Sequence, residues 1–142
     1  MGTLVTSWKI KTSLLIFSVV LVCLLVFPFN TTAIPEWRVQ VVDEVGAKLP
    51  GVMVSQDWGD SFAENQSHTD DRFTDVDGVV VFPERRVRAN GITRIARTVA
   101  SLINPHGGSG PSSFLTVTNP GDGFLLYSKG KPPPGKLVVQ TR

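Results

Sequence analysis

The amino-acid sequence predicts a mainly β domain, a seven-strand β-sandwich with one inserted helix, preceded by an N-terminal hydrophobic helix. Short segments with apolar residues at alternate positions recur between residues 37 and 140, separated by turns containing Gly and Pro. Such closely spaced short strands are typical of sandwiches. Only residues 91–103 change to the helical spacing of apolar residues. Residues 34–142 have the usual size of one domain.

Residues 1–33 carry a targeting pattern. Lys9 and Lys11 precede residues 13–29, which contain no charged side chain. A positive segment followed by an apolar run is typical of secretory signals, and Thr31-Thr32-Ala33 offers a small-residue cleavage site. The run is long for a cleaved signal and slightly short for a membrane span. A signal peptide and a retained single-pass anchor therefore both remain open, with the anchor slightly favoured.

Either outcome exports residues 34–142, because the N-terminal lysines stay on the inner side of the membrane. The domain is then anchored through residues 13–29 with its bulk outside the cytoplasm, or it is secreted or periplasmic after cleavage. Cys23 is the only cysteine and lies in the apolar run, so the domain has no disulfide framework. Export also argues against nucleic acid as a partner. Separately, we expect no cofactor.

The first pair of predicted strands comprises residues 37–43 and 52–58. Both segments alternate apolar and polar side chains, which is the signature of half-buried strands. The connection between them ends in Leu49-Pro50-Gly51, where Pro fixes φ and Gly tolerates a positive φ. This pattern predicts a pair closed by its turn.

The second pair comprises residues 69–74 and 79–82, joined by the turn Asp75-Val76-Asp77-Gly78. Residues 79–82 form a continuous apolar run, which favours a strand buried on both faces near the centre of a sheet. Pro83 ends this strand because it has no N–H to donate.

A helix is predicted at residues 91–103, with Asn90 as its N-cap and Pro105 as its stop. One face of this helix is apolar, and the other carries Arg94 and Arg97. Three further strands follow it, at residues 114–118, 124–127 and 137–140.

Two turn motifs are shared with a known family. V-x-V-V-D-E-x-G-x-x-L-P-G-V-x-V at Val39–Val54 and T-D-x-D-G-x-V-x-F-P at Thr74–Pro83 resemble the carboxypeptidase regulatory-like modules. Residues 85–89 continue a pattern seen in bacterial secreted members. The resemblance covers the first half of the domain and implies an Ig-like, transthyretin-like (prealbumin-like) sandwich. It also implies a non-catalytic accessory or binding role for residues 34–142.

The acidic stretch from Asp70 to Asp77 admits a calcium-binding alternative. On an EF-hand loop, Asp75, Asp77, Gly78 and Glu84 would fall on positions 3, 5, 6 and 12. Position 1 would be a phenylalanine, which cannot bind calcium, and a strand follows the glycine. A hairpin turn whose aspartates bond their own backbone is therefore favoured.

His68 and His106 are the only histidines, and they lie in separate polar segments without metal-ligand spacing. The sequence contains neither G-x-S-x-G nor H-E-x-x-H. It also lacks the Tyr-Arg-Gly-Ser end of the transthyretin-like hydrolases and ends in Val-Val-Gln-Thr-Arg. No catalytic residue is therefore predicted, although a small envelope hydrolase using His68 or His106 remains an alternative.

Charge is distributed unevenly along the domain. Residues 43–84 hold ten acidic side chains against two basic ones, whereas residues 85–142 hold nine basic side chains against one acidic one. Such asymmetry can steer partners. The densest basic cluster is a candidate surface for anionic lipid, an acidic glycan or an acidic protein. Its members are Arg85, Arg86, Arg88, Arg94 and Arg97.

The sequence thus predicts a non-catalytic binding or scaffolding module displayed outside the cytoplasmic membrane. Its expected partners are the membrane, through residues 13–29, and an unidentified envelope protein or glycan. A structural protein whose basic face rests on the membrane surface is a further alternative.

Overall fold

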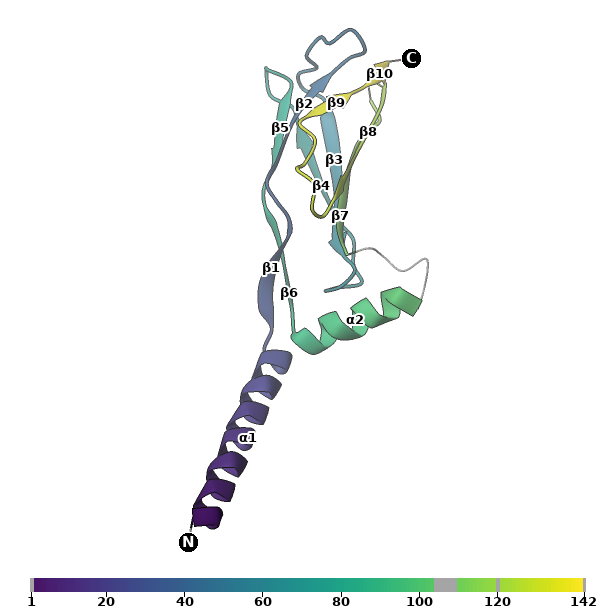
Figure 1. Ribbon diagram of the computed structural model, residues 1–142. Helices are drawn as coiled ribbons and strands as arrows, with labels where there is room; N and C mark the ends of the chain where they lie inside the picture. Colours follow the sequence, from purple (N-terminus) through teal and green to yellow (C-terminus); the bar gives the residue numbers. More distant parts are fainter. Residues whose placement is uncertain (1, 104–109, 120, 142) are drawn as a thin grey trace.

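The computed structural model describes residues 2–103, 110–119 and 121–141, and this part of the chain is mainly β (Figure 1). Its first elements are α1 (Gly2–Val26), β1 (Phe29–Ile34), β2 (Trp37–Val42), β3 (Met53–Asp60), β4 (His68–Phe73) and β5 (Val79–Phe82). Its later elements are β6 (Arg85–Ala89), α2 (Gly91–Ile103), β7 (Pro111–Val117), β8 (Gly121–Ser128), β9 (Lys136–Val138) and β10 (Gln140–Thr141).

The strands form a sandwich with an attached ribbon. One sheet has five strands in the order β10-β8-β7-β3-β4, and the facing sheet has three in the order β5-β2-β9. All neighbouring strands are antiparallel except β2 and β9, which are parallel. β1 and β6 form a separate two-stranded ribbon on the α1 side of the sandwich (Figure 1).

The core lies between the two sheets and is filled by alternate side chains of each strand. Trp37 and Phe82 are its largest fully buried side chains. The Trp37 ring lies 6.0 Å from the Tyr127 ring, and its Nε1–H donates to the Pro134 carbonyl oxygen at 2.7 Å. Burying such side chains stabilises the fold by about 1.5–3 kcal/mol each.

Seven of the strands lie where the sequence predicts them, namely β2, β3, β4, β5, β7, β8 and β9. The structure adds β1, β6 and β10, so the prediction of seven strands was too low. Residues 29–33, which the sequence pattern assigns to the targeting segment, lie within β1. That strand was missed because Thr31-Thr32-Ala33 also matches a small-residue cleavage site, which assigned the segment to the targeting pattern.

The predicted strand pairs are wrong, although the strands themselves exist. β2 pairs with β5 and β9, and β3 pairs with β4 and β7. Each Gly-containing connection therefore crosses from one sheet to the other. Thr74 joins the two connections, since its hydroxyl accepts from Val52 N at 2.9 Å and donates to Leu49 O at 2.7 Å.

β5 is an edge strand of its sheet, not the central strand that its apolar run predicted. Val80 and Phe82 point into the core, while Val79 and Val81 are partly exposed on the other face. A four-residue strand needs only two apolar residues to cover its buried face. A continuous apolar run therefore does not show whether the strand lies at the centre or at the edge of its sheet.

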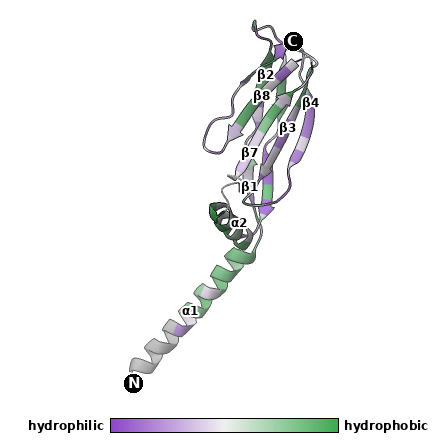
Figure 2. Ribbon diagram, turned by 90° about the vertical axis from the view of Figure 1, so that its right-hand side faces the viewer, coloured by the Kyte–Doolittle hydropathy of each residue, from purple (hydrophilic) through white to green (hydrophobic). Residues whose placement is uncertain are grey.

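α1 leads directly into the β-domain. After the helix ends, the chain becomes extended and enters β1, whose last residues Ala33 and Ile34 are buried. α2 continues from β6 and lies across the end of α1, with Gly91 against Leu25 (Figures 1 and 2). No helix within the described ranges has both the length and the apolar character needed to cross a membrane.

The turn at Gly78 offers a test of the crossing between the sheets. Gly78 has φ of +71°, and a Cβ there would lie 2.9 Å from Val41 O and 3.0 Å from Leu49 N. Gly51 has a similar φ of +68° with open space around it. Gly51→Ala is expected to cost about 1–2 kcal/mol of unfolding free energy from backbone strain alone. Gly78→Ala should cost more, because the clash adds to the strain.

Urea unfolding of both variants, followed by tryptophan fluorescence, measures the difference. Equal losses would show that the Gly78 turn relaxes away from Val41 and Leu49 without cost.

Candidate functional site

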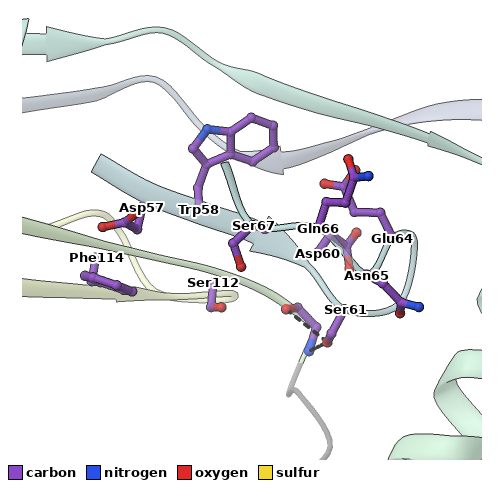
Figure 3. Close-up of a pocket in the computed structure, with 12 residues that line it drawn as sticks. Asp57, Trp58, Asp60, Ser61, Glu64, Asn65, Gln66, Ser67, Ser112 and Phe114 are labelled. Carbon is purple, nitrogen blue, oxygen red and sulfur yellow. Dashed lines mark hydrogen bonds between the residues drawn. The ribbon is translucent and has the colours of Figure 1, made fainter. Parts of the chain in front are cut away.

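A pocket of about 350 Å³ opens beside β3 and β7, at the end of the sandwich near α2 (Figure 3). Its walls are rich in carboxylate, amide and hydroxyl groups. These come from Asp57, Glu64, Asn65, Gln66, Ser67 and Ser112. Asp57 and Ser112 lie on the opposite side of β3 from the Trp58 ring (Figure 3). The pocket therefore opens on the outer face of the five-stranded sheet.

The loop that forms one wall of the pocket is held by Asp60, which is almost fully buried. Its Oδ1 accepts from Phe62 N at 3.0 Å, and its carbonyl oxygen accepts from Ala63 N and Glu64 N at 2.9 Å. Ser61 Oγ accepts from Gly110 N at 2.9 Å, which ties the loop to the start of β7 (Figure 3). These bonds fix the wall before any ligand arrives.

Two aromatic rings extend the site along the outer face of the sheet. Phe114, on β7, lies beside Asp57 in the register and lines the pocket. Its ring is 5.8 Å from that of Phe124 on β8, and the two residues are 38% and 60% exposed. Leu126, also exposed, pairs with Phe114 across β7 and β8. The outer face thus combines an apolar surface with adjoining hydrogen-bonding groups.

Sequence reasoning missed this site. The alternation of side chains along residues 111–117 and 121–128 could have placed Phe114 and Phe124 on one face. The pairing of β7 with both β3 and β8, which brings them beside Asp57, carries no local signal in the sequence.

Arg85 is used inside the fold. Its side chain is 17% exposed and forms an ion pair with Asp70, which also accepts from Arg72 Nε at 3.0 Å. Arg85 Nε and Nη2 donate to Gln56 Oε1 at 3.2 and 3.1 Å, and its guanidinium lies 5.5 Å from the centre of the Trp58 ring. Arg85 therefore braces β6 against β3 and β4.

The pKa of Asp70 lies below its ordinary value. Partial burial acts to raise this pKa, but hydrogen bonds from Arg85 and Arg72, together with their positive charges, outweigh burial. The carboxylate form is therefore favoured by the folded state.

Arg94 is also enclosed, with an 18% exposed side chain. One guanidinium nitrogen lies 3.6 Å from Asp60 Oδ2, and another donates to Thr31 Oγ1 at 2.7 Å. The guanidinium also lies 5.0 Å from the centre of the Phe29 ring. Arg97 bonds to Asn65 Oδ1 of the pocket loop. Both side chains of α2 thus point toward the β-domain.

Arg86 and Arg88 lie on the exposed face of β6, and Arg86 pairs with Glu84. Arg85, by contrast, contacts Gln56, on the other face of the strand. The structure therefore does not gather the five arginines of the basic cluster into one patch.

His68 Nε2 lies 3.0 Å from Glu64 Oε1, and its ring stacks on Trp58 with centres 4.4 Å apart. His106 lies outside the described residues. Within the described part of the chain, no three His, Cys, Asp or Glu side chains come together as a metal site.

The acidic stretch adopts the turn that the sequence favours. Asp75 Oδ1 accepts from Asp77 N at 2.9 Å and Val79 N at 2.8 Å, and Gly78 takes a positive φ. Asp77 bonds to Lys48 at 2.8 Å, which lowers the pKa of the aspartate and raises that of the lysine. These bonds occupy carboxylate oxygens that the calcium alternative would need.

No protein-family model, curated protein or solved structure gives a significant match to this chain. The resemblance to carboxypeptidase regulatory-like modules therefore stays a prediction.

Asp70→Asn tests the role of the Arg85–Asp70 pair. It should lower the free energy of unfolding by about 1–3 kcal/mol, because it removes a charged hydrogen-bond acceptor from a mostly buried arginine. The stabilisation by Asp70 is present above the ordinary aspartate pKa of about 3.9 and is lost as pH falls through its lower folded-state pKa. The wild-type protein should therefore lose more stability than the variant below about pH 4.

Chemical denaturation at a series of pH values between neutral and strongly acidic conditions measures both curves. Asp71→Asn, at the neighbouring exposed position, is the matched control. Parallel curves for the wild type and Asp70→Asn would contradict this role.

Proposed function

We propose that the protein is a non-catalytic binding module carried outside the cytoplasmic membrane by its N-terminal apolar segment. The observation that carries the binding role is the preformed polar pocket beside the exposed Phe114 and Phe124 rings. The turn motifs at Val39–Val54 and Thr74–Pro83 support a module of carboxypeptidase regulatory-like type.

The chemistry of the site favours a hydroxyl-rich ligand, such as a neutral glycan chain of the envelope. Carboxylate, amide and hydroxyl side chains bond to sugar hydroxyls, while aromatic rings contact the apolar faces of sugar rings. Asp57 and Glu64 both line the pocket, so an anionic ligand would meet like charge. This distinguishes the pocket from the exposed Arg86 and Arg88 of β6, whose charges favour anionic partners.

Membrane attachment is supported by the sequence and by the exposure of α1. Residues 13–29 carry no charge, and the large apolar side chains from Leu14 to Phe27 are between 46% and 67% exposed, except Leu25, which is partly buried beside Gly91 of α2. Exposed apolar surface of this extent is unfavourable in water. A lipid environment removes that cost.

The hydrolase alternative is carried by the pair of His68 and Glu64 near the pocket. A carboxylate that orients a histidine is a common arrangement for a general base. Ser61, however, is bonded to the Gly110 backbone, and the His68 ring is stacked on Trp58. If the alternative holds, ester or amide hydrolysis by the protein should be abolished in His68→Ala.

The glycan-binding proposal predicts that Phe114→Ala and Phe124→Ala weaken ligand binding. Loss of about 1 kcal/mol of ring contact corresponds to roughly a fivefold increase in the dissociation constant. Titration of the full chain in detergent with maltotriose, cellotriose and chitotriose, followed by NMR, provides the measurement. Val45→Ala, in an exposed turn outside the pocket, should bind as the wild type does.

Failure of all three oligosaccharides to bind would count against a neutral glycan ligand. Equal binding by Phe114→Ala and the wild type would place the ligand elsewhere on the domain.

The attachment proposal predicts that arginines in α1 release the protein from membranes. An arginine near the centre of a membrane helix costs about 2.5–3.5 kcal/mol on insertion scales. The double variant Leu21→Arg/Leu24→Arg should move from the membrane pellet to the supernatant during alkaline extraction. Val45→Arg/Val76→Arg adds the same charges at exposed turns of the sandwich and should stay in the pellet. Wild-type protein in the supernatant would contradict the proposal.

A further inference from the structure

α2 carries its apolar side chains on the outside of the molecule. Helix residues on this face are about half exposed or more, and none of the residues of α2 is buried. They are Ile92 (52%), Ile95 (56%), Val99 (49%), Leu102 (81%) and Ile103 (78%). A surface helix of a water-soluble domain normally turns such a face toward the core.

The polar face of α2 is the face that contacts the β-domain. Arg94 reaches Asp60 on β3 and Thr31 on β1, and Arg97 reaches Asn65 in the pocket loop. Asn90 caps the helix, its Oδ1 accepting from Thr93 N at 2.8 Å. The helix is therefore fixed with its arginines inward, and its apolar face points away from the sandwich.

The outward face lies on the side from which α1 extends. α2 begins at the C-terminal end of α1, where a Cβ on Gly91 would lie 3.3 Å from the Leu25 Cα. In both views α1 runs away from α2 in the direction opposite to the sandwich (Figures 1 and 2). The exposed apolar side chains of α1 and those of α2 thus lie at the same end of the β-domain (Figures 1 and 2).

We propose that α2 lies flat in the headgroup–acyl boundary of the lipid bilayer that holds α1, with its apolar face toward the acyl chains. This inference rests on the membrane attachment proposed above and adds a second contact with the same membrane. A marked separation of apolar and basic faces is typical of helices that lie in the plane of the interface. One bilayer covers both α1 and α2, whereas a second copy docked on α2 would leave α1 exposed.

The contact fixes how the domain stands on the membrane. α1 alone would allow the domain to tilt, but an embedded α2 gives it a second point of attachment. Arg88, exposed on β6 just before α2, then lies near the headgroups, where its charge is attracted to anionic lipid. Part of the basic cluster would thus meet lipid, although its five arginines do not form one patch.

Spin labels on single cysteines test the inference in the full chain. The protein is reconstituted in vesicles of phosphatidylethanolamine and phosphatidylglycerol, and collisions of the label with oxygen and with a water-soluble nickel chelate are compared. The native Cys23 reports on α1. Val99→Cys and Leu102→Cys, in a Cys23→Ser background, report on the apolar face of α2, and Thr98→Cys reports on its polar side.

Labels at positions 99 and 102 should collide with oxygen several times more often than with the nickel chelate, and the label at position 98 should show the reverse. A nickel preference at both 99 and 102 would place the apolar face in water and overturn the inference. Low collision rates with both reagents would also overturn it, because they indicate cover by protein, such as a second copy. The Cys23 label is read separately, so nickel access there would contradict the attachment through α1 whatever α2 shows.

Discussion

The guanidinium group of Arg94 determines how α2 and the β1–β6 ribbon sit on the sandwich. It joins α2 to β1, to β6 and to the carboxylate of Asp60 at the end of β3. Asp60 is almost fully buried, and a buried carboxylate needs a nearby positive charge. Since that charge comes from the polar face of α2, the apolar face has to point outward. An internal electrostatic requirement thereby creates the external apolar surface on which the proposed membrane contact depends.

The same kind of pairing explains what becomes of the charge asymmetry along the chain. Acidic residues dominate the first half of the domain and basic residues the second, yet Asp60 and Asp70 of the first half contact Arg94 and Arg85 of the second. Some of the opposite charges therefore join distant segments of the chain. Fewer unpaired charges remain on the surface to steer partners. The pocket keeps a mildly acidic lining because its other carboxylates, Asp57 on β3 and Glu64 in the following loop, contact Thr69 and His68 and none of the described arginines.

Local signals in the sequence were enough to locate most elements but not their partners. Alternation and turn residues placed seven strands, and spacing with Asn90 as cap placed α2 at its observed bounds. Strand pairing depends on contacts such as those of Thr74, which join two connections about 25 residues apart, and no local pattern encodes them. The apolar spacing of α2 likewise shows that the helix has two faces without showing which one meets the domain. For the same reason Phe114 and Asp57 could not be recognised as neighbours.

If the proposed export signal is cleaved, β1 links that processing to the order of events during biogenesis. The small-residue stretch Thr31-Thr32-Ala33 lies inside a strand that is paired with β6, and Ala33 is 3% exposed. A protease needs its substrate in an open, extended form, so cleavage of the folded domain requires the ribbon to open first. Cleavage at this site and folding are therefore competing events in time. Under the proposed export, a chain that folds before the protease acts would keep its apolar helix, and the rate of ribbon closure would decide between a tethered and a released molecule.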